Sequence, residues 1–182
     1  MRGHILCWST IFISSVLLGE TAMPKKVRQD GFSVIGIEVR TTNAKEMSGA
    51  GAIPAQWQKF FQDGVQQKIP DKVDGTIYAV YSDYASDRNG EYSFVIGAKV
   101  GPNAKAPEGM VLKKIPSGEY AVVTSDKGPV SKVVPAVWQK IYSLEDQHQL
   151  GGPRAYRADF EVYDQRAADP QNSQVDVYVG LK

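Results

Sequence analysis

The sequence is poor in the residues that build disulfides and metal sites. It contains one cysteine, Cys7, and two histidines among 182 residues. A single cysteine excludes a disulfide between two cysteines of the same chain. The histidines, His4 and His148, stand far apart and do not form a His/Cys cluster with the spacing of a metal site. We therefore expect neither a metal nor another cofactor.

The sequence also lacks an excess of charge of one sign. Lys and Arg number 21 against 20 Asp and Glu, so the formal net charge is +1, and no basic block is present. The motifs of common catalytic sites are missing as well, since there is no GxSxG, no HExxH and no Ser/His/Asp set with a suitable histidine. These absences argue against nucleic-acid binding and against the corresponding hydrolase and metalloprotease classes.

Only one long hydrophobic run is present, at the N-terminus. Residues 5–18 resemble the hydrophobic region of a signal peptide and are short for a membrane span. The basic residues Lys25 and Lys26 follow, which does not favour export. In a second interpretation translation starts at Met23, and residues 1–22 are then a mis-assigned start. The protein is exported in the first interpretation and cytoplasmic in the second, and in neither do residues 1–22 join the fold or anchor it in a membrane.

The most informative feature that is present is an internal repeat. Ile53 to Phe61 reads IPAQWQKFF, and Val134 to Tyr142, 81 residues later, reads VPAVWQKIY, with five identical positions. A repeat of this kind indicates a duplicated structural unit. Apolar residues recur at helical spacing in both copies, and proline is tolerated in the first turn of a helix. Each copy therefore predicts the start of an amphipathic helix.

The repeat extends to the strands around each helix. Three segments rich in β-branched and aromatic residues have counterparts at offsets of 82 or 83 residues. They are 37–41 with 120–124, 78–82 with 160–164, and 94–99 with 177–182. We predict an α+β fold of two β-α-β-β repeats, related by pseudo-two-fold symmetry, with a ligand cleft between them. The halves cover about residues 31–101 and 110–182 and form a single domain over residues 27–182.

Local signals predict several boundaries. The first strand should cover Phe32–Thr42, and a Gly-rich loop over residues 43–52 should lead into a helix over residues 53–68. Asn89-Gly90 lies between two alternating segments and predicts a hairpin whose central residues have positive φ. Pro116-Ser117-Gly118 predicts a bulge or break in a strand of the second half.

Glu161 is the residue most suggestive of a site. Alternation along its strand places Glu161 and Tyr163 on one face and Phe160 on the other. The equivalent of Glu161 in the first half is Ala79, so the duplicated fold does not need a glutamate at this position. The residues alone leave two interpretations open, a functional carboxylate or an ordinary solvated strand glutamate.

Aromatic residues gather in the same repeated segments. Trp57 and Trp138 hold matching places in the two helices, and Tyr81 corresponds to Tyr163. Each has an ordinary interpretation as core packing and a second as the wall of a pocket between the halves. A carboxylate among aromatic rings suits a cationic guest, because a cation over a Trp or Tyr face gains about 0.5–2 kcal/mol. The predicted ligand-binding set is Glu161, Tyr163, Trp138, Tyr81, Trp57 and Phe60, with no catalytic or metal-binding residue.

Several segments resemble a known family. They are residues 36–43, the IPAQWQKFF helix, residues 78–84 with 92–97, and DFEVYD at residues 159–164. Over residues 27–182 the chain resembles the GyrI-like, AraC-type effector-binding domain, and most closely the stand-alone integron-associated effector-binding proteins. The resemblance implies two β-α-β-β modules with a cleft between them. It also implies a role for Glu161, since in multidrug-sensing relatives a glutamate on the matching strand contacts cationic, lipophilic drugs among aromatic side chains.

The resemblance leaves three functions open. The one we favour is a stand-alone binding module for cationic or amphipathic aromatic compounds. The second is a hydrolase of reactive small molecules, as reported for some relatives, in which Glu161 positions or deprotonates water. The third is an inhibitor of the gyrase-inhibitor type, which would have a protein partner and an exposed apolar patch. The helix-turn-helix domain of the family's regulators has no room in this chain, so we expect no direct nucleic-acid binding.

Overall fold

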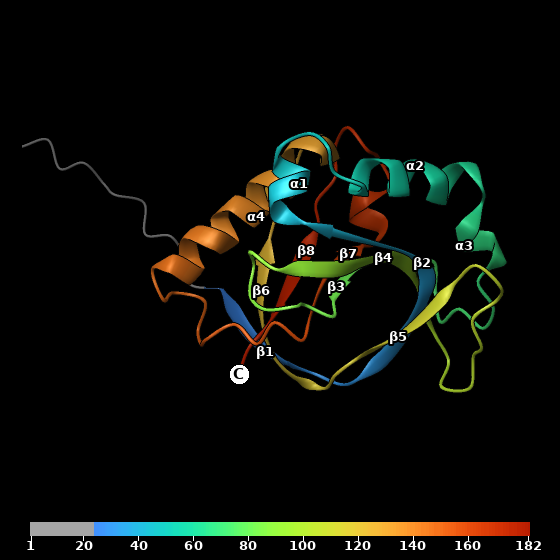
Figure 1. Ribbon diagram of the computed structural model, residues 1–182, viewed down its shortest axis with the longest axis horizontal. Coiled ribbons are helices and arrows are strands. Elements are labelled where there is room, and N and C mark those ends of the chain that lie inside the picture. Colours follow the sequence, from blue (N-terminus) through green and yellow to red (C-terminus); the bar gives the residue numbers. More distant parts are fainter. Residues whose placement is uncertain (1–23) are drawn as a thin grey trace, which may run out of the picture.

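Eight antiparallel strands form one curled sheet, and the longer helices lie across one of its faces (Figure 1). The structure is a computed structural model and describes residues 24–182, so the predicted signal-like segment 1–22 lies outside the described residues. The elements in chain order are β1 (Lys25–Gln29), β2 (Phe32–Thr42), α1 (Asn43–Met47), α2 (Ile53–Gln62), α3 (Val65–Lys68), β3 (Ile77–Ser82), β4 (Glu91–Val100), β5 (Val111–Ile115), β6 (Gly118–Thr124), α4 (Val130–Asp146), β7 (Ala158–Tyr163), the 3-10 helix η1 (Gln165–Ala167) and β8 (Asp176–Gly180). The prediction of an α+β fold is confirmed, and the sheet is an antiparallel half-barrel.

The order of the strands relates the two halves of the chain. It runs β1-β6-β8-β7-β3-β4-β2-β5. From the central pair, β7 and β3, the sheet continues outward through β8, β6 and β1 on one side and through β4, β2 and β5 on the other. The strands β8 and β4, and the strands β6 and β2, contain segments that correspond in the sequence repeat. At the centre, Ala79 lies directly opposite Glu161, its own equivalent in the repeat. Glu161 therefore lies at the junction of the two halves.

The outer strands join the halves a second time. Residues 25–29 pair with 118–122 and residues 32–36 pair with 111–115, both antiparallel and in the same continuing register. Pro116 and Ser117 interrupt the second-half strand, as the sequence predicted, because proline cannot donate to a strand ladder. On either side of the interruption, β5 pairs with β2 and β6 pairs with β1. The edge strands β1 and β5 thus belong to one interrupted antiparallel pair of segments, and the sheet is curled (Figure 1).

The helices of the first half depart from the prediction in two places. A single helix over residues 53–68 was wrong, because Gly64 adopts a left-handed φ of 59° and separates α2 from α3. Residues 43–52, predicted as a loop, begin with the short helix α1. Its N-cap is Thr42, whose side chain accepts a hydrogen bond from the Lys45 amide.

The long helix of the second half begins earlier than predicted. Because α4 starts at Val130, Pro135 lies inside the helix and not in its first turn. An interior proline removes one helical hydrogen bond. The first turn is held instead by the carbonyl of Pro129, which accepts from the amides of Lys132 and Val133. The first-half copy does begin at the predicted residue, Ile53, with its proline in the first turn.

The predicted hairpin of β3 and β4 is confirmed, but its turn differs. The strands pair antiparallel across an eight-residue loop, residues 83–90. Neither Asn89 nor Gly90 has a positive φ, whereas Asp83 does, at 49°. The Asn89 amide donates to the Asp87 carboxylate at 2.8 Å, which is a side-chain-stabilised turn within a longer loop. A longer loop does not require the two-residue turn that Asn-Gly predicted.

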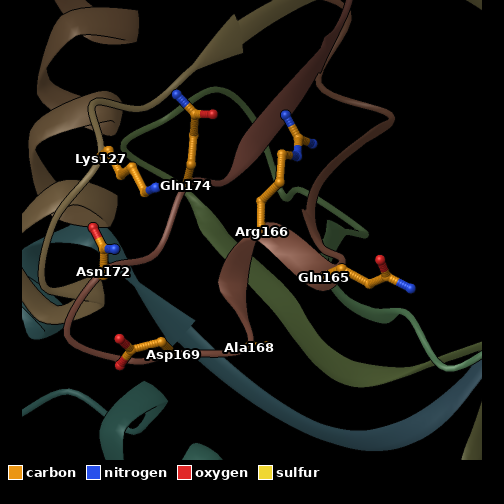
Figure 2. Close-up of a pocket in the computed structure, with 7 residues that line it drawn as sticks. All are labelled: Lys127, Gln165, Arg166, Ala168, Asp169, Asn172 and Gln174. Carbon is orange, nitrogen blue, oxygen red and sulfur yellow. The ribbon is translucent and has the colours of Figure 1, made fainter.

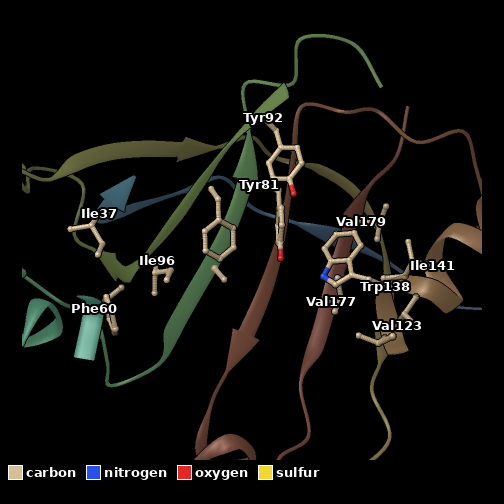
Figure 3. Close-up of a cluster of buried hydrophobic side chains, with 14 of the residues drawn as sticks. Ile37, Phe60, Tyr81, Tyr92, Ile96, Val123, Trp138, Ile141, Val177 and Val179 are labelled. Carbon is tan, nitrogen blue, oxygen red and sulfur yellow. The ribbon is translucent and has the colours of Figure 1, made fainter. Parts of the chain in front are cut away.

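Each face of the sheet carries its own hydrophobic core. The face under the helices contains Tyr81, Trp138 and Ile141, drawn with their neighbours in Figure 3. The opposite face contains Val80, Phe160 and neighbours contributed by the outer strands. Strand alternation thus sends Phe160 into one core and Glu161 into the other, as predicted. Among residues 24–182, no helix has the length and apolarity needed to cross a membrane.

Candidate functional site

Glu161 is a buried carboxylate surrounded by aromatic hydrogen-bond donors. Only 1% of its surface is exposed, so the interpretation of a solvated strand glutamate does not hold. Its Oε1 accepts from the Tyr81 hydroxyl at 2.7 Å and from the Trp138 indole Nε1 at 2.6 Å, and its Oε2 accepts from the Tyr163 hydroxyl at 2.6 Å. Figure 3 shows Tyr81 and Trp138 side by side, with their polar atoms turned toward the same space. The donors come from β3, α4 and β7, so both halves of the chain build the site.

Two opposing effects determine the pKa of Glu161: burial raises it, and hydrogen bonding lowers it. Removal from water raises the pKa of Glu161 above its ordinary value of 4.5, and the bonds from Trp138, Tyr163 and Tyr81 offset only part of that rise. Burial, together with the charge of Glu161, holds the pKa of both tyrosines well above 10. The tyrosines therefore stay protonated and act as donors. None of the three donors carries a positive charge.

The aromatic side chains around Glu161 occur as two matching pairs. The rings of Trp138 and Tyr81 lie 4.9 Å apart with an interplanar angle of 64°. The rings of their equivalents in the repeat, Trp57 and Tyr163, lie 5.0 Å apart at 67°. The two Trp–Tyr pairs thus have nearly the same ring geometry, but of the two tryptophans only Trp138 donates to Glu161.

The residues predicted for the site fall into two groups, those that bond to the Glu161 carboxylate and those that do not reach it. Tyr81, Trp138 and Tyr163 bond directly to Glu161, and Trp57 packs on Tyr163. Phe60, with 1% of its surface exposed, is the buried residue of α2, and its ring lies 6.1 Å from that of Trp57. Phe60 therefore supports the position of Trp57 and does not reach the carboxylate.

A second buried carboxylate on the same face was not assigned from the sequence. Asp159, with none of its surface exposed, lies two residues before Glu161 in β7. Its Oδ2 accepts from Arg154 Nη2 at 2.7 Å and from the Tyr84 hydroxyl at 2.6 Å, and its Oδ1 accepts from the Gly180 amide at 2.8 Å. Asp159 therefore has three donors, as Glu161 does, but one of them is a cation.

Arg154 occupies an aromatic enclosure of its own. Its guanidinium carbon lies 4.5 Å from the ring centre of Tyr156, 5.6 Å from that of Trp138 and 5.8 Å from that of Tyr84. Burial lowers the pKa of Arg154, but the charge and hydrogen bond of Asp159, together with Tyr84 and Tyr156, outweigh burial and the net shift of the pKa is upward. Sequence reasoning missed this residue because Arg154 follows a Gly-Gly-Pro loop without any pattern, and Tyr84 comes from a loop 70 residues away.

Two surface hollows lie away from Glu161. One, of about 300 Å³, is lined by mostly polar side chains (Figure 2), namely Lys127, Gln165, Arg166, Ala168, Asp169, Asn172 and Gln174. The other, of about 600 Å³, includes Phe32, Lys99 and Lys114. Neither contains Glu161 or its donors. Within residues 24–182 there is also no group of three or more His, Cys, Asp or Glu side chains arranged to hold a metal.

Comparison with known proteins identifies the family. Residues 27–181 match the family model Cass2, described as integron-associated effector binding protein. YobU of Bacillus subtilis, whose name provisionally assigns it to the transcriptional regulators, is 34% identical over 148 residues, which is 81% of this chain and 90% of YobU.

Two solved structures share the fold. An integron cassette protein of Vibrio cholerae superposes with a TM-score of 0.67 at 26% identity, covering 88% of this chain and 96% of that one. The protein SAV2435, solved bound to tetraphenylphosphonium, superposes with a TM-score of 0.71 at 17% identity, covering 88% and 94%. The buried carboxylate thus lies in a chain that belongs to the Cass2 family of integron-associated effector-binding proteins.

Proposed function

We propose that the protein is a stand-alone module that binds small cationic aromatic compounds at Glu161, between two halves related by pseudo-two-fold symmetry. The observation that carries the proposal is a fully buried carboxylate whose three hydrogen-bond partners are all neutral. A buried charge without a counter-charge is costly for the fold. Its presence is understandable if an incoming cation supplies the missing charge.

The aromatic surroundings favour the same class of ligand. A cation gains about 0.5–2 kcal/mol over the face of a Trp or Tyr ring, and Trp138, Tyr81 and Tyr163 all lie within hydrogen-bonding distance of the carboxylate. Tetraphenylphosphonium, the compound bound by SAV2435, is both cationic and aromatic. A ligand of this kind would replace the tyrosine and tryptophan donors at Glu161.

The pseudo-two-fold relation between the halves rests on matching contacts. Besides the two pairs at Glu161, the Trp138 and Tyr142 rings lie 5.9 Å apart, and those of Trp57 and Phe61, one turn along the equivalent helix, lie 5.8 Å apart. The direct pairing of repeat-equivalent residues in β3 and β7 supports an axis beside Glu161. Superposition of residues 32–100 on 118–182 tests the relation, and failure of α2 and α4 to coincide would contradict it.

Entry of a ligand requires the aromatic cover to move. The carboxylate is buried, but Trp57 on α2 is only half-buried and its neighbour Phe61 is 64% exposed. We therefore place the entry between α2 and the rest of the domain. Displacement of Trp57 and Tyr163 toward solvent would uncover Oε2 of Glu161 first.

Calorimetric titration with tetraphenylphosphonium tests the proposal. Glu161→Gln keeps the shape of the side chain and removes its charge. We expect a loss of about 1.5–3 kcal/mol in binding free energy, the scale of the attraction between opposite charges roughly 6–10 Å apart at an effective dielectric constant near 20, which is about tenfold or more in affinity. Glu108→Gln, which removes the same charge from an exposed position, should leave the affinity unchanged.

A neutral ligand provides the second control. Triphenylphosphine oxide has similar rings without a net charge, so its affinity should change little between wild type and Glu161→Gln. Equal affinity of the two proteins for tetraphenylphosphonium would refute Glu161 as the anchor. Chemical change of a reactive ligand during incubation, absent in Glu161→Gln, would favour the hydrolase alternative instead.

A further inference from the structure

Two lysines line the larger of the two surface hollows, the one of about 600 Å³. They are Lys99 and Lys114, and every other residue that lines this hollow is uncharged. Neither lysine has an ion-pair partner among residues 24–182. The wall of the hollow therefore carries positive charge that no described carboxylate pairs with directly.

The hollow lies where three neighbouring strands end. Strand β2 lies between β4 and β5 in the sheet, and it contributes its first residues while β4 and β5 contribute their last. Ser33 of β2 pairs with Val100 on one side and with Lys114 on the other. Lys99, the neighbour of Val100, therefore projects from the opposite face of the sheet to Lys114. Both lysines line the hollow because it lies at the strand ends.

Apolar side chains form much of the remaining wall. Val73 is 56% exposed, which is unusual for an apolar side chain of this size in the described part of the chain. Phe32 is half-buried, its ring packs on Tyr78 and Phe160, and the Lys99 ammonium lies 5.0 Å from its ring centre. Small-molecule sites of a few hundred Å³ combine mostly apolar walls with a few polar groups that orient the ligand. The hollow has this composition.

The lysine next to Lys114 in the sequence differs from it in its partners. The Lys113 ammonium lies 2.7 Å from Glu38 and 2.6 Å from Asp83, so its charge is compensated within the fold. Lys99 and Lys114 have no such partners, and Lys99 is half-buried against an aromatic ring. A charge that is partly shielded from water and salt attracts an opposite charge more strongly than one in open solvent. The hollow therefore favours an anionic guest.

We infer that this hollow is a second binding site, for small amphipathic organic anions that carry a carboxylate or sulfonate on an apolar body. The apolar body would pack against Val73 and Phe32, and the acid group would contact the ammonium of Lys99 or Lys114. The charge that this site requires is opposite to the charge that Glu161 requires, so the two sites would take different compounds. The second site does not depend on the proposed function at Glu161.

Two fluorescent dyes form a matched pair of probes. Anilinonaphthalene sulfonate is an amphipathic anion, and N-phenyl-1-naphthylamine has the same rings without the sulfonate. In fluorescence titration, wild-type protein should bind the sulfonate dye, and the affinity should fall as the salt concentration rises, because salt screens the attraction to the lysines. The affinity for the neutral dye should not fall. Failure of the sulfonate dye to bind, or binding that is independent of salt, would overturn the inference.

Substitutions in the wall assign the binding to the hollow. Lys99→Gln/Lys114→Gln should weaken binding of the sulfonate dye roughly tenfold, since each exposed or half-buried ion pair contributes up to about fivefold, and should change binding of the neutral dye less than about twofold. Val73→Asn removes apolar wall and should weaken binding of both dyes. Lys140→Gln, which removes a lysine charge from an exposed position on α4, is the matched control and should change neither affinity. An unchanged affinity for the sulfonate dye in the double lysine variant, or an equal loss in the control, would overturn the inference.

Further measurements separate the two sites and test other occupants of the hollow. Glu161→Gln should bind the sulfonate dye as tightly as wild type, and the double lysine variant should bind tetraphenylphosphonium as tightly as wild type. Loss of the sulfonate dye in Glu161→Gln would overturn a separate anion site. Sedimentation of the protein with phosphatidylglycerol vesicles, dependent on both lysines and without binding of the free dye, would assign the hollow to a membrane surface and overturn the inference. Dimerisation that Val73→Asn abolishes, again without dye binding, would assign the hollow to a second copy of the chain and overturn it as well.

Discussion

Asp159 and Glu161 are two buried carboxylates on one face of one strand, and they differ in a single respect. Each accepts three hydrogen bonds, and each is less than 2% exposed. One donor to Asp159 is the Arg154 cation, whereas the donors to Glu161 are two tyrosines and a tryptophan. The charge of a carboxylate with an internal counter-ion is compensated within the fold. The charge of a carboxylate with neutral donors is not compensated, so it can attract a cation from outside.

The largest effect on stability should come from breaking the ion pair of Arg154 and Asp159. Asp159→Asn removes the closer and fully buried ion-pair partner of Arg154 and leaves only Glu145, at 3.3 Å, which should lower the free energy of unfolding by about 3 kcal/mol. Glu161→Gln removes an unpaired charge, so its stability should hold or rise. Urea denaturation of the two variants measures the difference. A loss of similar size in both would mean that the two carboxylates are structurally equivalent.

The next effect tests why only one half carries a carboxylate. Ala79 is fully buried and faces Glu161 directly across β3 and β7, and like charges directly opposite each other in a sheet destabilise it. Ala79→Glu should therefore lower the free energy of unfolding by about 3 kcal/mol, the scale of an uncompensated buried charge.

A second substitution, Glu161→Ala, tests whether the two sides of the central strand pair can each hold the carboxylate. In Ala79→Glu/Glu161→Ala the carboxylate moves to the other half, where Trp57 and Tyr163 correspond to Trp138 and Tyr81. We expect the second substitution to recover most of the lost stability in thermal or urea unfolding. Ala79→Gln serves as the steric control, and a double variant no more stable than Ala79→Glu would contradict the matched surroundings.

An effect of intermediate size concerns pH. Because the pKa of Glu161 is raised in the folded protein, folding favours its protonated form, and this group stabilises the fold most at low pH. From pH 4.5 up to the raised pKa, the free energy of unfolding should fall by up to about 1.4 kcal/mol per pH unit through this residue. The difference in stability between wild type and Glu161→Gln, measured across that range, isolates the contribution.

Ligand affinity should change with pH in the opposite direction. A cation binds the ionised carboxylate, so the affinity for tetraphenylphosphonium should rise by up to about tenfold per pH unit over the same range, with release of a proton. Calorimetry in buffers of different ionisation enthalpy detects that proton. Binding that is independent of pH in wild type would show that the charge of Glu161 does not participate.

The smallest effect should come from Trp138, which contacts both regions. Trp138→Phe keeps an aromatic ring but removes the Nε1 donor to Glu161. We expect a loss of about 1.5 kcal/mol in stability, the lower end of the range for one hydrogen bond to a charged group. The removal of one donor should also raise the pKa of Glu161 further, which the pH dependence of tetraphenylphosphonium binding would report. An unchanged pH profile would contradict a role for the indole in tuning the carboxylate.

Features that depend on local pattern could be predicted from the sequence alone. Alternation along β7 separated Glu161 and Tyr163 from Phe160, because side chains of a strand point to opposite faces in turn. The internal repeat related Trp57 to Trp138 and Tyr81 to Tyr163, and it distinguished Glu161 from Ala79 without knowledge of any contact. The extent of β2 and the interruption at Pro116 also followed from residue type.

The errors in the prediction arose where local patterns allow more than one backbone. Proline is favoured in the first turn of a helix, yet Pro135 lies inside α4 because the packing of the preceding turn extends the helix. Asn-Gly suits a two-residue turn, yet the loop between β3 and β4 has eight residues and does not use one. In both cases the tertiary structure overrode a preference worth only a few kcal/mol at most.

Which of the buried charges have a counter-charge could not be predicted from the sequence, because it depends on the tertiary structure. Whether a carboxylate is buried and what donates to it depend on residues that are distant in the chain: Tyr81 is 80 residues from Glu161, and Tyr84 is 75 from Asp159. No periodicity marks Arg154, whose position follows from a loop that folds back over α4 and β7. The strand pattern thus gave the face on which Asp159 and Glu161 lie. The difference between them is a long-range electrostatic property, because it depends on which side chains the fold brings within about 3 Å of each oxygen.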